Sequence, residues 1–267
     1  MKRVLTVAIS PCPNDTFIWG AIALGYLRTP FAWEFRYEDI QTLNELAQTG
    51  EIDILKLSFF QYALLPRGLY RLLPVGAAMG YGVGPLLVAR APIPYDKLGD
   101  ISIGIPGKHT TAYSLLRFFA PHAQHLVEMR YDALLPAVAN NQIQAAVIIH
   151  ESRFTYPSYG LVCLQDLGAY WTGQTGYPIP LGGIGIKRGV PRRPMVRLLR
   201  RSLHAAWKAR VPLLSDYVAH HAQEMAPEVQ LAHIRLYVNR YTYRLGPLGW
   251  KAIRYYIRWV RSWNRIQ

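Results

Sequence analysis

His150 is the residue whose type and position best suit proton chemistry, because it directly follows the apolar run 145–149. That run ends in two β-branched isoleucines, which predicts a strand covered on both faces in a parallel sheet. Ligands of open α/β sheets bind beyond the carboxyl ends of the strands, so this imidazole is expected to face a bound molecule. Imidazole exchanges protons near neutrality, which makes His150 a candidate general base. The alternative is a hydrogen-bonded loop histidine.

A second polar group follows the predicted strand 52–57. Lys56, Leu57 and Ser58 stand at its carboxyl end. Ser58 would either cap the predicted helix 59–65 or present its hydroxyl, with the neighbouring backbone, to a ligand.

A third group begins the helix predicted over residues 112–120. Thr110 and Thr111 follow the predicted strand 101–105 through the turn PGKH. Hydroxyls and free backbone N–H groups point out of a helix start, so a carboxylate could be held there. Neither a Walker spacing nor a Gly-x-Gly-x-x-Gly motif is present, so nucleoside triphosphate chemistry is not expected.

A fourth candidate is the loop SPCPND after the predicted strand 3–9. Two prolines make this loop rigid, and Asn14 or Asp15 is expected to N-cap a helix over residues 17–27. A helix start after a strand also suits an anion or a hydroxyl. Capping alone is the alternative.

The elements that position these groups alternate between strands and helices, which predicts an α/β fold with parallel sheets. Glycine- or proline-rich crossings near residues 80–95 and 176–183 predict two lobes with a ligand cleft between them. We expect one lobe to contain residues 1–90 and 184–267, including four C-terminal helices that each have a proline near the start. The other, residues 91–183, carries His150.

Length and composition describe a globular protein of 267 residues, 51% of them hydrophobic, which is enough for two lobes. The N-terminal apolar run is too short for a secretory signal, and no window has the length of a membrane span, so a cytoplasmic location is expected. The two cysteines, Cys12 and Cys163, are expected to be reduced. Neither they nor the histidines have zinc-site spacing, so we expect no metal.

Positive charge is concentrated in residues 187–267, which hold 17 basic and 3 acidic residues and account for the whole net charge of +14. The last predicted helix, 247–266, has a cationic face flanked by aromatic residues. The basic residues are Lys251, Arg254, Arg258, Arg261 and Arg265, and the aromatic ones are Trp250, Tyr256, Trp259 and Trp263. This face either rests weakly on anionic lipid or is solvated, with its aromatics packed on the domain or on a second subunit of a homodimer. No nucleic-acid-binding motif is present, so we expect no nucleic-acid partner.

Five spaced motifs connect the chain to a known family. They are SPCPNDTF at 10–17, KLSF at 56–59, PGKHTTA at 106–112, IIHESRFTYP at 148–157 and TGYPIPLGGI at 175–184. HAQEMAPEV and AHIRLYVN extend the match into the C-terminal helices. The chain resembles the 1,4-dihydroxy-6-naphthoate synthases of the futalosine route to menaquinone.

The resemblance implies a fold like that of type II periplasmic binding proteins. It also implies a lyase that converts cyclic dehypoxanthine futalosine, a small-molecule carboxylate, into 1,4-dihydroxy-6-naphthoate and a sugar-derived fragment without a cofactor. His150 matches the proton acceptor of the family. Lys56, Leu57 and Ser58, with Thr110 and Thr111, match its substrate-binding segments. The segment LGAYWTGQTG departs from the family because it lacks acidic residues.

Two other functions fit parts of the same pattern. A chorismate dehydratase-like enzyme of the same pathway would share the fold and perform a related elimination. A non-catalytic small-molecule binding protein would share the fold alone, since fold does not fix function.

Overall fold

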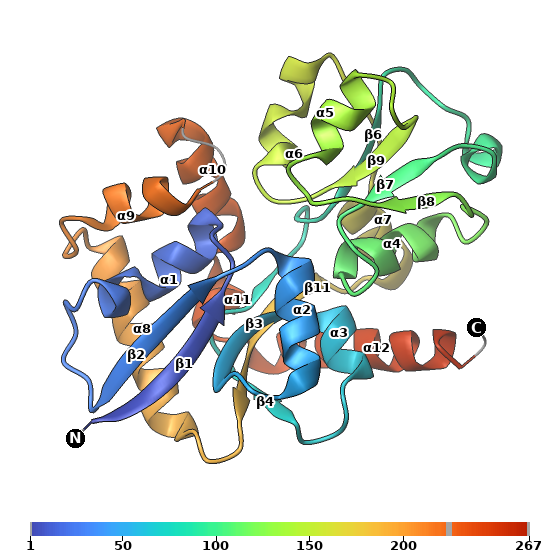
Figure 1. Cartoon of the computed structure of the whole chain (residues 1–267). Coiled ribbons are helices and arrows are strands. Elements are labelled where there is room, and N and C mark those ends of the chain that lie inside the picture. The colour runs from blue at the N-terminus through green and yellow to red at the C-terminus, as the bar shows by residue number, and fades with distance from the viewer. Residues whose placement is uncertain (1, 223–225, 266–267) are drawn as a thin grey trace.

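The computed structural model describes residues 2–222 and 226–265. Two β-sheets, each flanked by helices, form two lobes (Figure 1). The predicted α/β two-lobed fold is thereby confirmed. Gln223, Glu224 and Met225 of the HAQEMAPEV motif, and Ile266 of the last predicted helix, lie outside the described residues.

The first sheet has the strand order β2-β1-β3-β11-β4, and β5 also pairs with β11. Its strands are β1 (Arg3–Ile9), β2 (Phe31–Tyr37), β3 (Ile54–Ser58), β4 (Tyr70–Leu72), β5 (Ala78–Gly80) and β11 (Ile179–Lys187). The strands β1, β2 and β3 are parallel, as predicted. The strand β11 is antiparallel to β3, β4 and β5, because the chain returns from the other lobe.

The second sheet has the order β10-β6-β9-β7-β8. Its strands are β6 (Leu86–Ala89), β7 (Ile103–Ile105), β8 (Leu126–Glu128), β9 (Ala145–Ile148) and β10 (Val162–Asp166). The strand before His150, β9, is fully buried and parallel to β7. It is antiparallel to β6, so the prediction of purely parallel sheets is wrong.

Helices cover both sheets. With the first sheet lie α1 (Pro13–Ala23), α2 (Ile40–Thr49), α3 (Phe59–Leu64), α8 (Arg192–Trp207), α9 (Leu214–His221), α10 (Pro227–Tyr237), α11 (Arg240–Tyr243) and α12 (Gly246–Trp263). With the second lie α4 (Thr111–Phe119), α5 (Leu134–Ala139), α6 (Ser152–Thr155), α7 (Leu167–Thr175) and the 3₁₀ helices Tyr95–Gly99 and Tyr156–Tyr159. None of the described helices is long and apolar enough to cross a bilayer.

The last helix, α12, packs against α3 and β11 of the first lobe and contacts α4 and α7 of the second (Figure 1). Tyr256 and Val260 are fully buried in a core that also contains Phe59 of α3 and Trp171 of α7. Trp250, Trp259 and Trp263 pack against this core, and Trp259 meets Phe118 of α4 edge-on at 5.2 Å. The aromatic side chains beside the cationic face therefore pack against the protein core and are not available for insertion into a lipid surface.

Two strands bear on where one lobe ends and the other begins. The strand β6 belongs to the second sheet, although the predicted first lobe extends to residue 90. The segment 176–183, expected as a crossing, is mostly part of β11 in the first sheet. We propose that the second lobe comprises residues 85–178, because the sheet to which a strand bonds defines its lobe better than the glycine and proline content of its flanks.

Candidate active site

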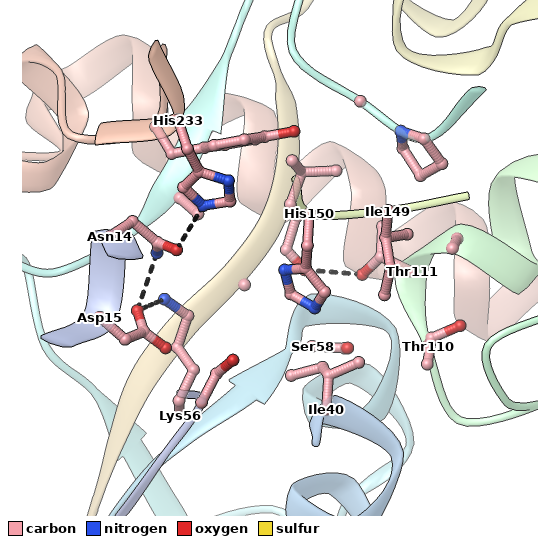
Figure 2. Close-up of a pocket in the computed structure, with 18 residues that line it drawn as sticks. Asn14, Asp15, Ile40, Lys56, Ser58, Thr110, Thr111, Ile149, His150 and His233 are labelled. Carbon is pink, nitrogen blue, oxygen red and sulfur yellow. Dashed lines mark hydrogen bonds and ion pairs between the residues drawn. The ribbon is translucent and has the colours of Figure 1, made fainter. Parts of the chain in front are cut away.

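The cavity that collects most of the predicted site residues lies between the two sheets and has a volume of about 90 Å³. Residues from both lobes line it (Figure 2). Of the predicted residues, it is lined by Asn14, Asp15, Lys56, Ser58, Thr110, Thr111 and His150. Leu57 is the exception.

The strand β3 explains that exception. All five of its residues are buried, and successive side chains of a strand point to opposite faces. Lys56 and Ser58 therefore face the cavity, whereas Leu57 packs in a core with Leu43 and Ala47 of α2. The side chain of Leu57 is therefore directed away from a ligand in the cavity.

The ammonium group of Lys56 forms an ion pair with Asp15, and both side chains are about 95% buried. Asn14 Nδ2 donates a hydrogen bond to the same carboxylate at 2.9 Å. Desolvation makes isolated buried charges costly, so this carboxylate and ammonium depend on each other. Figure 2 shows the pair on one side of His150, with Thr110 and Thr111 on the other.

The helix α1 begins earlier than predicted. Pro13 is its first residue and Cys12 occupies the N-cap position, so the expectation that Asn14 or Asp15 caps a helix from residue 17 is wrong. Proline favours the first helical position because its fixed φ fits and its missing N–H is not needed there. Asn14 and Asp15 consequently lie in the first turn and point into the cavity.

His150 follows β9 in the left-handed region, with φ of 57°. That conformation is uncommon for a residue with a side chain and turns the chain sharply at the strand end. The Nδ1 atom lies 3.0 Å from Cys12 Sγ, while Nε2 is shielded from solvent and has no hydrogen-bond partner among the described residues. Tyr131 meets the ring edge-on at a centroid distance of 5.1 Å.

Burial lowers the pKa of His150 to about 4, and the positive charge of Lys56 acts in the same direction. Asp39 opposes them more weakly. The imidazole is therefore neutral at physiological pH and can accept a proton. Burial likewise raises the pKa of the Cys12 thiol well above its ordinary value, so this group stays protonated.

The two threonines are held by the protein itself. Thr110 caps α4 by accepting from the Tyr113 N–H at 3.2 Å, and Thr111 Oγ1 donates to the Leu181 carbonyl at 2.8 Å. The backbone N–H groups of Thr111 and Ala112, in the first turn of α4, have no acceptor within the helix and are free to bind a ligand. Both residues line the cavity.

The turn before these threonines depends on Gly107. Its φ of 126° is open only to glycine, and a Cβ atom there would lie 2.2 Å from the amide oxygen of Gln41. That same oxygen accepts the His109 N–H at 3.0 Å. The glycine therefore lets α2 of the first lobe hold the loop of the second.

Ser58 does not cap α3 with its side chain. Its hydroxyl accepts from Asn44 Nδ2 at 3.0 Å, and its backbone N–H donates to Asn44 Oδ1 at 2.8 Å. The hydroxyl proton is left to donate to a ligand.

Four further residues at or beside the cavity were missed from the sequence. His233 and Tyr237 of α10 line it, Cys12 contacts His150, and Glu151 is buried next to His150. Asn14 Oδ1 lies 2.9 Å from His233 Nε2, and burial followed by the proximity of His150 lowers the pKa of His233 well below its ordinary value. The signal was present, because His233 and Tyr237 lie within the AHIRLYVN motif.

Cys12, His150 and Glu151 present metal-ligating atoms within 4.8 Å of one another. The Sγ–Nδ1 distance of 3.0 Å is shorter than the ~3.6 Å that separates a sulfur and a nitrogen bound to the same tetrahedral Zn²⁺. This pair is spaced for a hydrogen bond rather than for an ion.

Two curated relatives align with nearly the whole chain. A 1,4-dihydroxy-6-naphthoate synthase from Thermus thermophilus is 44% identical over 254 residues, which cover 94% of this chain and 92% of the relative. A synthase of the same name from Streptomyces coelicolor is 42% identical over 261 residues, covering 94% and 90%.

Solved structures give the same picture at the level of the fold. A protein from Archaeoglobus fulgidus superimposes with a TM-score of 0.90 at 31% identity, covering 99% of this chain and 98% of that one. The alkanesulfonate-binding protein SsuA from Xanthomonas axonopodis matches with a TM-score of 0.65 at 15% identity, covering 88% and 84%, which supports the periplasmic-binding-protein-like fold alone. The family model described as menaquinone biosynthesis matches residues 5–262. The chain therefore belongs to the menaquinone biosynthesis family.

Proposed function

We propose that this protein is a lyase that converts cyclic dehypoxanthine futalosine into 1,4-dihydroxy-6-naphthoate, with His150 as the proton acceptor. The observation that carries the proposal is the Nε2 atom of His150, which has no partner in the described part of the chain and lies beside a cavity that both lobes line. Relatives at 44% and 42% identity bear the name of this synthase, which supports the choice of substrate.

The chemistry needs a neutral base in a site shielded from water. With its pKa lowered to about 4, His150 is unprotonated at neutral pH and takes a proton from the substrate. Electrons released by that step drive an elimination in which the bond to the sugar-derived fragment breaks. Formation of the aromatic naphthoate ring supplies the driving force, so the elimination needs no redox cofactor.

The cavity offers separate partners for the two ends of the substrate. The N–H groups at Thr111 and Ala112 suit the carboxylate, because anions are favoured at a helix start. The hydroxyl of Ser58 donates nearby. On the opposite side, Asn14 and Asp15 present polar atoms that suit the hydroxyls of the sugar-derived part.

Incubation with cyclic dehypoxanthine futalosine tests the proposal, with naphthoate absorbance as the readout. Wild type is expected to form the product, and His150→Ala to lose at least 100-fold in kcat, in line with the ~10²–10⁴-fold contribution of a general base. His125→Ala is the matched control, since His125 is exposed in the same lobe.

Parallel incubations identify the alternatives. Turnover of chorismate instead would indicate a dehydratase, and ligand binding without turnover of either substrate would indicate a binding protein. Full activity of His150→Ala would remove the base assignment while leaving the substrate assignment intact.

We also propose a cytoplasmic location and a weak electrostatic contact of α12 with anionic surfaces. Lys251, Arg254, Arg258 and Arg265 are exposed, whereas Arg261 is half-buried and donates to the Ala63 carbonyl at 2.9 Å. The exposed face supports attraction to anionic lipid without insertion of aromatic rings. A homodimer remains a proposal that size-exclusion chromatography with light scattering tests.

A further inference from the structure

We propose that Cys12 is a positioning residue for His150: its sulfur accepts a hydrogen bond from Nδ1–H and thereby leaves Nε2 as the proton acceptor. The inference rests on the proposed function, because it is the role of His150 as a base that requires a lone pair on the cavity side. It assigns a task to a buried thiol that does not itself line the cavity.

The thiol is held firmly in place. Cys12 is 1% exposed, and its carbonyl accepts the backbone N–H groups of Asp15 and Thr16 in the first turn of α1. Ser10 Oγ donates to Cys12 Sγ at 2.8 Å. A sulfur fixed by the helix start and by a hydroxyl gives the imidazole a defined acceptor at 3.0 Å.

The ring of His150 has one orientation with respect to this sulfur. Tyr131 packs edge-on against it, and the His233 ring lies nearly parallel, 25° away in plane and 6.3 Å between centroids. The Nδ1 edge faces Cys12, while Nε2 finds no partner among the described residues. A neutral imidazole has one N–H, so a lone pair on Nε2 places the proton on Nδ1, where the sulfur accepts it.

Sulfur suits this position because it is a weak acceptor. A carboxylate in its place would favour the imidazolium form and keep the base protonated at higher pH. The charged and titratable groups that act on or face His150 are Lys56, Asp15, Asp39, Tyr131, Glu151 and His233. The neutral thiol of Cys12 orients the ring without adding a negative charge to these groups.

The contact also joins the lobes, since Cys12 precedes α1 in the first lobe and His150 follows β9 in the second. The two residues are 138 positions apart in sequence. The base is therefore oriented only when the lobes are together, which ties proton abstraction to lobe closure.

Nitrogen-15 NMR of histidine-labelled wild type tests the tautomer independently of catalysis. The resonance that disappears in His150→Ala identifies this residue. Nδ1 is expected to show the shift of a protonated ring nitrogen and Nε2 that of an unprotonated one. A protonated Nε2 at neutral pH would overturn the proposal even if the enzyme turns over the substrate, whereas an inactive wild type would overturn only the proposed function.

Kinetics with futalosine-derived substrate test the positioning role. Cys12→Ala is expected to lower kcat about 10- to 100-fold with little change in KM, because a misplaced base slows the chemical step more than it weakens the binding of substrate. Cys12→Ser retains an acceptor and should restore most of the rate. Cys163→Ala, the matched control in β10, should leave the rate unchanged.

The pH dependence of kcat/KM in Cys12→Asp distinguishes positioning of His150 from a purely structural role, because a purely structural role would leave this dependence unchanged. The acid limb of the plot of kcat/KM against pH is expected to move to a pH about 1–3 units higher, because a carboxylate stabilises the imidazolium. An unmoved acid limb in a folded Cys12→Asp protein, or an unchanged kcat in Cys12→Ala, would contradict the proposal.

Discussion

Asn44 Nδ2 donates a hydrogen bond of 2.8 Å to the backbone carbonyl of His109, joining α2 of the first lobe to the loop that precedes α4 in the second. The same amide holds Ser58 through two further bonds. Asn44 is fully buried, so the network replaces hydration that these groups lose.

Asn44→Ala is expected to lower the free energy of unfolding by about 2–3 kcal/mol, because it leaves buried partners at Ser58 and His109 unsatisfied. Chemical denaturation measures the change. Asn140→Ala, at the exposed C-cap of α5, is the control and should stay within about 0.5 kcal/mol of wild type. Equal stabilities of the two variants would show that the bridge contributes nothing.

The lowered pKa of His150 predicts how stability depends on pH. The unfolded chain binds a proton below about pH 6.5, whereas the folded state resists protonation down to about pH 4. The contribution to stability is therefore fully present above pH 6.5 and is lost as pH falls between these values. The slope from this group is at most ~1.4 kcal/mol per pH unit.

Denaturation of wild type and His150→Gln across pH 4–7 isolates that slope. The variant should be less sensitive to pH than wild type in this window, and His125→Ala should follow wild type. A variant as pH-sensitive as wild type would mean that His150 titrates normally.

The Lys56–Asp15 pair predicts strong coupling in a double-mutant cycle. Lys56→Met alone leaves a buried carboxylate without its counter-charge and should cost about 3–5 kcal/mol. Adding Asp15→Asn should recover much of that stability, since neither buried charge then remains. Thermal and chemical unfolding of the four proteins give the coupling, and additive losses would argue against the pair.

The cationic face of α12 predicts salt-dependent binding to anionic vesicles. Binding to phosphatidylserine vesicles at low salt, measured by co-sedimentation, is expected to weaken when Arg254 and Arg258 are both replaced by Gln. The loss in binding free energy should be about 1 kcal/mol per charge. Replacing Arg67 and Arg71, two exposed residues of the first lobe, by Gln removes the same number of charges and is the control. No binding of wild type at low salt would remove the idea.

Much of the fold could be predicted because local patterns were strong. The run before His150 became β9, and Pro227 begins α10 as expected. Strand direction was not predictable, because β6 and β11 enter their sheets from the other lobe, and no local pattern records that.

The site was predicted as far as strand ends and helix starts reveal it. The position of His150 follows from the apolar run, and those of Lys56 and Ser58 from the carboxyl end of another predicted strand, whereas the alternation of side chains along β3 turns Leu57 away from the cavity. Cys12 and His233 were missed as site residues, since their roles depend on contacts between segments more than 80 residues apart. Spacing within one segment carries no information on such contacts.

The hydrogen bonds from α2 and α3 to the loop at His109 to Thr111 lie beside a cavity of about 90 Å³. A bicyclic acid bearing a sugar-derived ring is larger than this space, so the contacts between the lobes have to open and close again for each molecule that enters and leaves. If this opening limits turnover, the rate should fall as the viscosity of the solvent rises.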